Sequence, residues 1–257
     1  VADDMSNCDM TCFEGVKKIT GREDIPFIKM NFCDLDAVNK LFSEFQIDAV
    51  IHFAAFKAVG ESVSEPVKYY SNNLSSFLNV IEAAKTHGGC NVLFSSSATV
   101  YGEPDKLPVT EESPRQPATS PYGNTKQISE EIITDAINSG VGYKSIILRY
   151  FNPVGAPPSA EIGALPNGVP QNLIPYLTQT AIGIRKELSV FGDDYDTPDG
   201  SCIRDFINVV DLAKAHVVAI SRMLDNPDTD PIEIFNLGTG SGVSVLELIN
   251  TFETATG

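Results

Sequence analysis

The sequence predicts an α/β fold, with a doubly wound parallel sheet and a smaller α/β lobe. Short apolar runs that read as strands alternate with segments whose apolar residues recur at helical spacing. The strand runs are apolar at nearly every position, which is typical of strands buried on both faces. Repeated strand-then-helix order with such strands indicates a parallel sheet covered by helices on both sides.

The predicted elements follow one another at short intervals. Strands are expected at 27–32, 48–53, 91–94, 145–149 and 231–235, and helices around 38–45, 74–81 and 128–137. Ser120 suits the N-cap of the last of these helices, and Gly140 suits its end. A further helix is expected over 173–184, and another starts at Ser244, where Glu247 completes a capping box.

The composition argues against some classes of binding partner. The chain has 18 basic and 34 acidic residues and a net charge of −16, which opposes binding to nucleic acid or to an anionic membrane. No stretch approaches the ~18 apolar residues of a membrane-spanning helix. The five cysteines form no CxxC pair. We expect reduced thiols in a cytoplasmic protein, and we predict no metal site.

Acidic residues follow the first two strands. In Rossmann-like sheets that bind dinucleotides, an acid ends the second strand, about 20 residues after a glycine-rich loop. Asp3 suits that position at the end of a strand remnant, although by itself it reads as a solvated turn residue. Asp34 follows the strand at 27–32, where it also suits a helix N-cap. We therefore expect the first strand and the glycine-rich loop to be missing before Val1, and the chain to be cut after Gly257.

Small and polar residues follow the next two strands, where ligands bind in open parallel sheets. Ala54 and Ala55 leave room for the close approach of a ligand, or form only a turn of small residues. Ser95, Ser96 and Ser97 either satisfy loop backbone groups or hydrogen-bond a reacting hydroxyl.

Tyr122 and Lys126 lie four residues apart at a predicted helix start, so they share one helix face. A cation beside a phenol lowers its pKa from about 10 towards neutrality, which makes the tyrosine a usable proton acceptor and donor. The spacing alone is a weak signal, because Lys is common and the chain has eight tyrosines. The order along the chain strengthens it: a strand, the serines, Tyr and Lys at a helix start, then another strand.

Residues 152–200 are rich in Pro, Gly and Asn, which indicates a second lobe with ligand-facing loops. The expected division is a cofactor-binding domain over 1–151 and a substrate-binding lobe over 152–257, with 204–225 returning to the first domain. Arg204 would suit a diphosphate through its planar donors. The simpler interpretation of Arg204 is a salt bridge to Asp205 or another acid.

Longer strings of sequence resemble a known family. The UDP-galactose 4-epimerases, which are extended short-chain dehydrogenases, have strings similar to Ser95-Ser-Ser-Ala-Thr-Val-Tyr-Gly102, Pro121-Tyr-Gly-Asn-Thr-Lys126 and Leu148-Arg-Tyr-Phe-Asn-Pro-Val-Gly-Ala156. The resemblance extends over nearly the whole chain. The YxxxK pattern marks only the superfamily, whereas the longer strings indicate the epimerases.

This resemblance implies a bound NAD, regenerated at each turnover, and UDP-galactose and UDP-glucose as substrates. Tyr122 would take the proton from the sugar 4-hydroxyl while C4 gives hydride to NAD+. Lys126 would lower the pKa of Tyr122 and hold the nicotinamide ribose, and Ser97 would hydrogen-bond the 4-oxygen. The 4-keto sugar would then turn about its fixed UDP anchor and take hydride back on its other face.

The resemblance also implies the binding residues. The cofactor would contact Asp3, Asp4, Asn7, Asp34, Leu35, Phe53, Ala54, Ala55, Lys57, Asn73, Ser97, Tyr122, Lys126 and Phe151. The UDP-sugar would contact Ser97, Tyr122, Asn152, Asn172, Leu173, Ser189, Val190, Phe191 and Arg204. A homodimer that acts in galactose metabolism is implied as well.

The chain departs from the family pattern at several places. The glycine-rich loop is absent, Ala55-Phe56 stands where Gly-Leu is usual, and Asn208 stands where His is usual. The absent loop includes the helix start that would bind the pyrophosphate. We therefore expect these 257 residues alone to be inactive and the complete parent protein to be active.

Two alternatives share this fold. A sugar-nucleotide 4,6-dehydratase needs an added acid and base near the serines, whereas Ala98 and Thr99 follow Ser97 and the next acid is Glu103. A non-catalytic NAD-sensing protein has no need of the serine, tyrosine and lysine together. Both alternatives are therefore disfavoured against epimerisation.

Overall fold

The computed structural model describes residues 1–140, 142–164, 168–226 and 228–257, which form two compact units. The first unit comprises Val1–Met5, Asp24–Tyr150 and Ala213–Leu237, and the second comprises Ser6–Glu23, Phe151–Leu212 and Gly238–Gly257. The chain therefore passes between the two units more often than the division predicted from the sequence implies.

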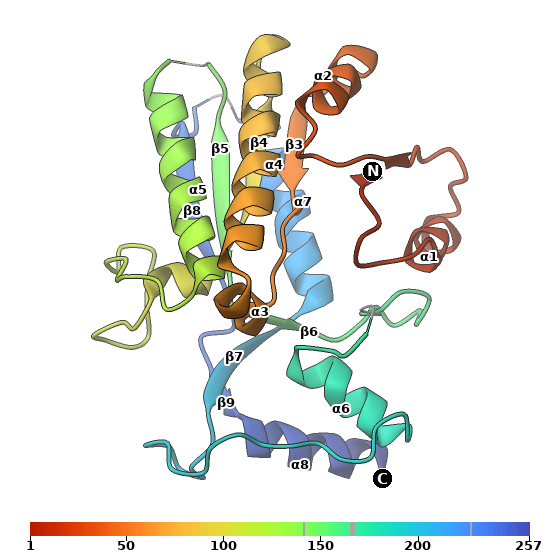
Figure 1. Cartoon of the computed structure of the whole chain (residues 1–257), viewed down its shortest axis with the longest axis vertical. Helices are drawn as coiled ribbons and strands as arrows, with labels where there is room; N and C mark the ends of the chain where they lie inside the picture. The colour runs from red at the N-terminus through yellow and green to blue at the C-terminus, as the bar shows by residue number, and fades with distance from the viewer. Residues whose placement is uncertain (141, 165–167, 227) are drawn as a thin grey trace. The chain divides into compact units, whose positions relative to one another are not determined.

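The first unit contains a four-stranded parallel sheet (Figure 1). Its strands, in spatial order, are β3 (Ala49–His52), β4 (Asn91–Ser97), β5 (Ser145–Tyr150) and β8 (Ile232–Leu237). The register pairs Ser97 with Tyr150 and Tyr150 with Leu237, so these strands end at one edge. Two further strands, β1 (Ala2–Asp3) and β2 (Ile28–Lys29), form a separate parallel pair. The predicted α/β class with a parallel sheet is confirmed.

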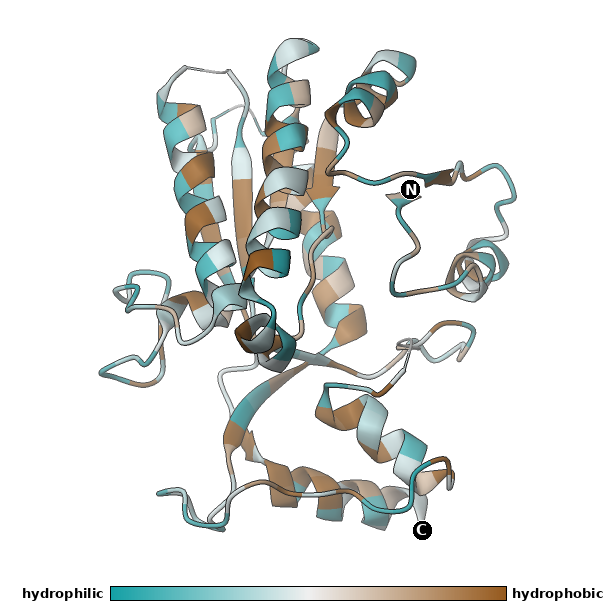
Figure 2. Ribbon diagram, in the orientation of Figure 1, coloured by the Kyte–Doolittle hydropathy of each residue, from teal (hydrophilic) through white to brown (hydrophobic). Residues whose placement is uncertain are grey.

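Helices cover both faces of the four-stranded sheet. On one face are α4 (Pro66–Thr86) and α5 (Pro121–Asn138), and on the other is α7 (Val209–Asp225). Phe77 of α4 and Ile133 of α5 pack with Phe94 of β4. Met223 of α7 packs with Leu93, the neighbour of Phe94 on the opposite face of β4. The sheet interior is accordingly apolar (brown strands in Figure 2), which explains the unbroken apolar runs in the sequence.

Short-range signals define the helix ends. The Ser120 side chain caps α5 by accepting a hydrogen bond from the Gly123 N–H at 3.1 Å, as predicted. Asp34 caps α2 (Leu35–Glu44) through the N–H groups of Asp36 and Ala37. A short helix, α3 (Val59–Ser64), precedes α4. Within the described ranges, no helix combines the length and apolar character needed to cross a bilayer.

The second unit is built around a three-stranded sheet of short strands. β7 (Ile203–Asn208) lies between β6 (Asn152–Val154), which is parallel to it, and β9 (Gly242–Ser244), which is antiparallel. The helices of this unit include α1 (Thr11–Thr20), α6 (Leu173–Ala181) and α8 (Val245–Thr256). The capping box at the start of α8 is present as predicted.

The units differ from the expected domains in two places. Residues 6–23 lie in the second unit because α1 packs closely on the segment near Glu161. A Cβ at Gly15 would lie 2.3 Å from the Glu161 carbonyl oxygen, and Lys18 pairs with the Glu161 carboxylate at 3.1 Å. The segment that returns to the first unit is Ala213–Leu237 and not 204–225, because β8 within it pairs with β5.

The cap of α5 gives a stability prediction. Replacing Ser120 with Ala leaves the Gly123 N–H without its acceptor, so we expect the free energy of unfolding to fall by about 1 kcal/mol. The matched control is Ser139→Ala at the exposed end of the same helix, where a loss below about 0.5 kcal/mol is expected. Urea unfolding of the full-length protein measures both, and equal losses would show that the cap has no special role.

Candidate active site

Ser97, Tyr122 and Lys126 lie together in the first unit, at the carboxyl edge of the sheet. Ser97 ends β4, Tyr122 lies in the first turn of α5, and Lys126 lies one turn later. The Ser97 hydroxyl lies close enough to the Tyr122 phenol to lower its pKa. The Thr99 N–H donates to the Ser97 oxygen at 3.2 Å.

The Lys126 ammonium is buried, with only 5% of the residue exposed. It donates to the Ser95 carbonyl at 2.6 Å and lies over the rings of Phe94 and Tyr122, at 4.9 Å and 5.8 Å from their centroids. Burial lowers the pKa of Lys126 to about 8, while the carboxylate of Glu130 acts in the opposite direction. Lys126 is therefore a cation that can lose its proton near neutral pH.

The expectation that Lys126 lowers the pKa of Tyr122 is wrong for the chain itself. Burial raises the pKa of Tyr122, and the nearby Ser97 hydroxyl opposes this rise. The Lys126 ammonium lies over the face of the ring, 5.8 Å from its centroid. In the protein alone, Tyr122 is accordingly a neutral phenol that holds its proton.

A second hydrogen-bonded group supports the same edge of the sheet. The Tyr150 hydroxyl lies 2.5 Å from Nε2 of His216 on α7. Burial raises the pKa of Tyr150, and the nearby Ser95 side chain opposes this rise. The imidazole also contacts Phe53, with ring centroids 5.0 Å apart. These contacts join the end of β4 to β5 and α7, and sequence reasoning missed them because they join distant segments.

The acidic residues predicted to hold the adenosine part of NAD lie at the ends of β1 and β2. Asp3 ends β1 and accepts a hydrogen bond from the Met5 N–H at 2.7 Å. Asp4 is close enough to Cys33, just after β2, to raise the pKa of that thiol. Asp34 caps α2, and the side chain of Leu35 next to it is exposed. The carboxylates thus gather at the carboxyl ends of two adjacent parallel strands, where a ribose and an adenine are recognised in such sheets.

The loop after β3 supplies the next predicted cofactor residues. Phe53 is 56% exposed and Lys57 is also exposed. Ala54 and Ala55 lie between them. Asn73 of α4 holds this loop, because its amide accepts from the Phe56 N–H at 2.8 Å and donates to the Phe56 carbonyl at 3.0 Å. Asn73 thus shapes the loop, and its direct contact with the cofactor stays a prediction.

The remaining predicted residues lie in the second unit. They are Asn7, Phe151, Asn152, Asn172, Leu173, Ser189, Val190, Phe191 and Arg204. The Asn152 amide donates to the Asp205 carbonyl at 3.0 Å. Arg204 donates to the Ile203 carbonyl, while the Asp205 carboxylate accepts from the N–H groups of Thr239 and Gly240. The simpler interpretation, a salt bridge between Arg204 and Asp205, is therefore not what the structure shows.

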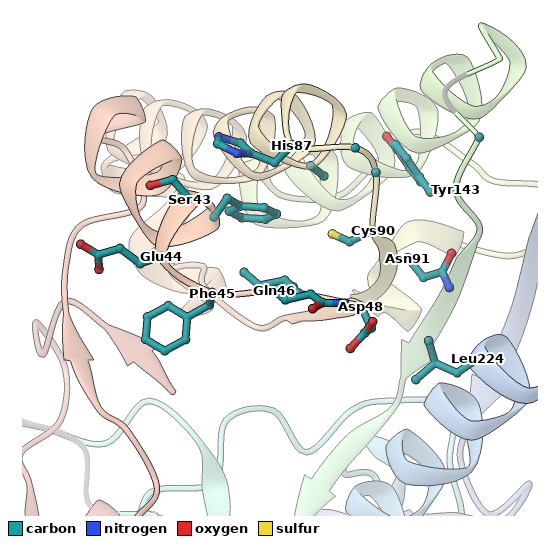
Figure 3. A pocket seen from close by; sticks show the side chains of 16 residues that line it. Ser43, Glu44, Phe45, Gln46, Asp48, His87, Cys90, Asn91, Tyr143 and Leu224 are labelled. Carbon is teal, nitrogen blue, oxygen red and sulfur yellow. The ribbon is translucent and has the colours of Figure 1, made fainter.

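A cavity of about 810 Å³ lies at the other end of the sheet (Figure 3). Asp48 and Asn91, at the starts of β3 and β4, line it together with Cys90 and Tyr143. It contains none of the residues predicted to bind cofactor or substrate. Among the described residues, no group of three or more His, Cys, Asp or Glu is arranged to hold a metal ion.

Comparison with known proteins identifies the family. A family model described as the NAD dependent epimerase/dehydratase family matches residues 11–238. The chain belongs to this family. The family name states that NAD is the cofactor, and the residues of this chain fit it. Carboxylates follow β1 and β2, small residues follow β3, and the Lys126 cation lies beside Tyr122. When bound, NAD supplies a reversible acceptor for hydride.

Several members of the NAD dependent epimerase/dehydratase family are similar over this whole chain. The UDP-glucose 4-epimerase of Bacillus subtilis (strain 168) is 48% identical over 257 residues, which are 100% of this chain and 74% of the relative. UDP-glucose 4-epimerase 2 of Arabidopsis thaliana is 49% identical over 259 residues, covering 100% of this chain and 73% of the relative. The solved UDP-glucose 4-epimerase of Bifidobacterium longum, in complex with NAD+ and UDP, matches with a TM-score of 0.93 and 46% identity, over 99% of this chain and 74% of that one.

The lowered pKa of Lys126 predicts a dependence of stability on pH. Between the folded pKa of about 8 and the unfolded value of 10.5, the unfolded chain binds more protons, so stability should rise with pH in this window. The full effect is roughly 3 kcal/mol. We expect the full-length protein to gain this stability relative to Lys126→Met as pH rises from 8 to 10.5.

Urea unfolding of the two proteins at a series of pH values measures the effect. Burial and the nearby Lys126 lower the pKa of His52 to about 3, so this imidazole stays neutral between pH 8 and 10.5. Parallel curves for the two proteins would contradict the lowered pKa.

Proposed function

We propose that the protein interconverts UDP-glucose and UDP-galactose by reversible oxidation at C4 of the sugar, with NAD as its bound cofactor. The observation that carries the proposal is the close approach of Ser97 to Tyr122, beside the buried Lys126, at the carboxyl edge of a parallel sheet. Relatives named UDP-glucose 4-epimerase, 48% and 49% identical over the whole chain, support the same conclusion.

The geometry assigns a task to each of the three side chains. Tyr122 is positioned to accept the proton of the sugar 4-hydroxyl and to return it after the 4-keto sugar has turned. Ser97 lies close to the phenol and stabilises its ionised form during that transfer. We assign to Lys126, whose ammonium lies 5.8 Å from the centroid of the Tyr122 ring, the task of holding the nicotinamide ribose. Because the proton leaves and returns within one turnover, a buried tyrosine that holds its own proton between turnovers suits the reaction.

The site favours epimerisation over the dehydratase alternative. Eliminating water from the sugar needs an acid and a base close to the serine, and the two residues after Ser97 are Ala98 and Thr99. Glu103, the next acid in the chain, follows the 3₁₀ turn Ala98–Tyr101 (η1) and is exposed. A protein that only senses NAD would not require the Ser97–Tyr122–Lys126 arrangement.

The proposal extends to the wider setting of the enzyme. The UDP-sugar would be held by residues of the second unit, which are Asn152, Asn172, Leu173, Ser189, Val190, Phe191 and Arg204. Arg204 is exposed, its guanidinium pairs with no carboxylate among the described residues, and it is the candidate for the diphosphate. Free thiols at Cys12, Cys33, Cys90 and Cys202 support a cytoplasmic location. A homodimer and a role in galactose metabolism are proposed on family membership.

The test is turnover of UDP-galactose by the full-length protein. We expect UDP-glucose to form without net release of NADH. Replacing Tyr122 with Phe removes the proton acceptor and should lower kcat by about 10²- to 10⁴-fold while NAD binding is kept. Net formation of NADH, or an unchanged kcat in Tyr122→Phe, would contradict the proposal.

Tyr143→Phe is the matched control for this test. Tyr143 is a buried tyrosine of the apolar core whose hydroxyl has no hydrogen-bond partner among the described residues. Removing that hydroxyl is expected to leave kcat at the wild-type value and the free energy of unfolding within about 0.5 kcal/mol of the wild type. A loss of turnover in the control equal to that in Tyr122→Phe would show a general effect of removing buried hydroxyls.

A further inference from the structure

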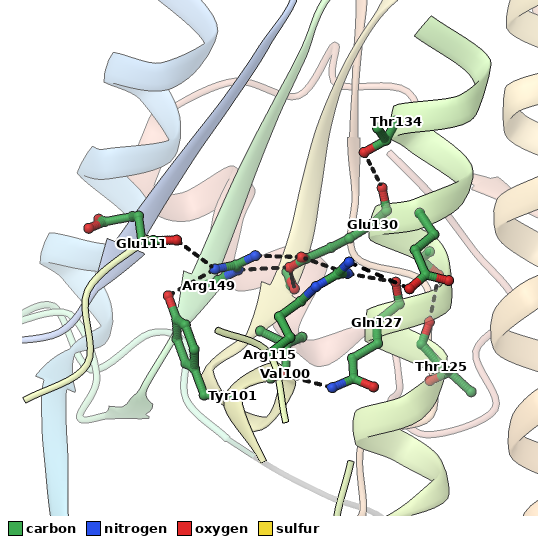
Figure 4. A network of polar contacts seen from close by, with 12 residues as sticks. Val100, Tyr101, Glu111, Arg115, Thr125, Gln127, Glu130, Thr134 and Arg149 are labelled. Carbon is green, nitrogen blue, oxygen red and sulfur yellow. Dashed lines mark hydrogen bonds and ion pairs between the residues drawn. The ribbon is translucent and has the colours of Figure 1, made fainter. Parts of the chain in front are cut away.

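Glu130 is a buried carboxylate one helical turn beyond Lys126, and only 3% of the residue is exposed. Arg149 of β5, also 3% exposed, binds it with two parallel hydrogen bonds, Nε to Oε1 at 3.0 Å and one terminal nitrogen to Oε2 at 2.7 Å. The partly exposed Arg115 adds a longer ion pair at 3.7 Å (Figure 4). Two-bond pairing of this kind fixes the plane and position of both groups.

This ion pair contacts the chain on both sides of Ser97. Before it, the Ser96 hydroxyl donates to Glu130 Oε1 at 2.6 Å. After it, the other terminal nitrogen of Arg149 donates to the Tyr101 hydroxyl at 3.0 Å, and Tyr101 is the last residue of η1. Ser97 therefore lies between two points that the same ion pair anchors.

The anchors constrain the direction of the Ser97 side chain. Neighbouring residues of a strand point to opposite faces, so fixing Ser96 towards Glu130 also fixes the rotation of the strand where Ser97 leaves it. Fixing Tyr101 also fixes the position of η1. The Thr99 N–H of η1 donates to the Ser97 oxygen and so orients it. The ion pair itself lies outside the contacts that Ser97, Tyr122 and Lys126 make with one another.

We infer that the Glu130–Arg149 pair, acting through Ser96 and Tyr101, is a positioning device that aims the Ser97 hydroxyl at Tyr122. This inference rests on the proposed function for its kinetic consequence, because an aimed serine matters only if Tyr122 exchanges a proton with substrate. Small displacements of such a group lower the chemical step strongly while leaving substrate binding intact. Glu130 also favours the charged form of Lys126, which supports the same site.

The first experiment compares two buried serines between β4 and β5 in the full-length protein. Ser96→Ala removes the anchor to Glu130, and we expect kcat with UDP-galactose to fall about 10-fold while KM changes less than about two-fold. Ser145→Ala is the matched control, because its hydroxyl donates to the Val92 carbonyl at 2.7 Å at the opposite end of the same strand pair. Its kcat should stay at the wild-type value. Equal kcat in the two variants overturns the inference.

The second experiment separates positioning from stability. Removing one partner alone would leave a buried charge unpaired, whereas replacing both is often neutral for folding. In Glu130→Gln/Arg149→Met we expect an unfolding temperature near that of the wild type and a kcat lowered about 100-fold. A folded double variant with wild-type kcat overturns the inference.

Crystal structures of the two serine variants provide a readout that needs no substrate. The distance between the hydroxyl oxygens of Ser97 and Tyr122 should increase in Ser96→Ala and keep its wild-type value in Ser145→Ala. An unchanged distance in Ser96→Ala overturns the positioning role whatever the activity. Absence of UDP-galactose turnover in the wild type would instead overturn the proposed function and leave this structural test standing.

Discussion

The burial of the Lys126 ammonium against the Ser95 carbonyl is the interaction on which the site depends. A charge removed from water is costly unless it is well paired, so the 2.6 Å hydrogen bond strongly restricts where α5 can lie on β4. Fixing that one contact sets the first turn of α5 above the end of β4. Tyr122 and Ser97 then meet as a consequence, although 25 positions separate them in the sequence.

The surrounding structure gives this contact a rigid frame. The apolar interior, with Phe77, Phe94 and Ile133 at its centre, holds α4 and α5 on the sheet, and the polar groups of the site lie at the edge where the strands end. A second layer of polar contacts lies behind the reacting groups. Glu130 and Arg149 support Ser97 from one side, and the Ser95–Tyr150–His216 contacts tie β4 to β5 and α7. A site in which Tyr122 accepts a proton and later returns it benefits from such rigidity, because the distance between Tyr122 and the sugar 4-oxygen must be the same in both halves of the reaction.

Features determined by nearby residues were predictable from the sequence. The caps at Asp34, Ser120 and Ser244 depend on side chains within three residues of the helix start, and the strands of the main sheet were readable because both faces are apolar. Features determined by distant contacts were not. The three-residue strands β6 and β9 form only because β7 lies beside them, and α1 joins the second unit through contacts near Glu161. The direction of the Tyr122 pKa was missed because burial and the contact with Ser97, not helix spacing, determine it.

The fate of a deuterium label at C4 of the substrate tests most directly whether this site carries out reversible oxidation at that carbon. The full-length protein would be supplied with UDP-glucose deuterated at C4, mixed with an unlabelled UDP-sugar of different mass. If hydride leaves C4 and returns to the same sugar while Tyr122 handles only the hydroxyl proton, all of the UDP-galactose formed from the labelled substrate keeps its deuterium. Loss of the label to water, or its transfer to the unlabelled sugar, would contradict that chemistry.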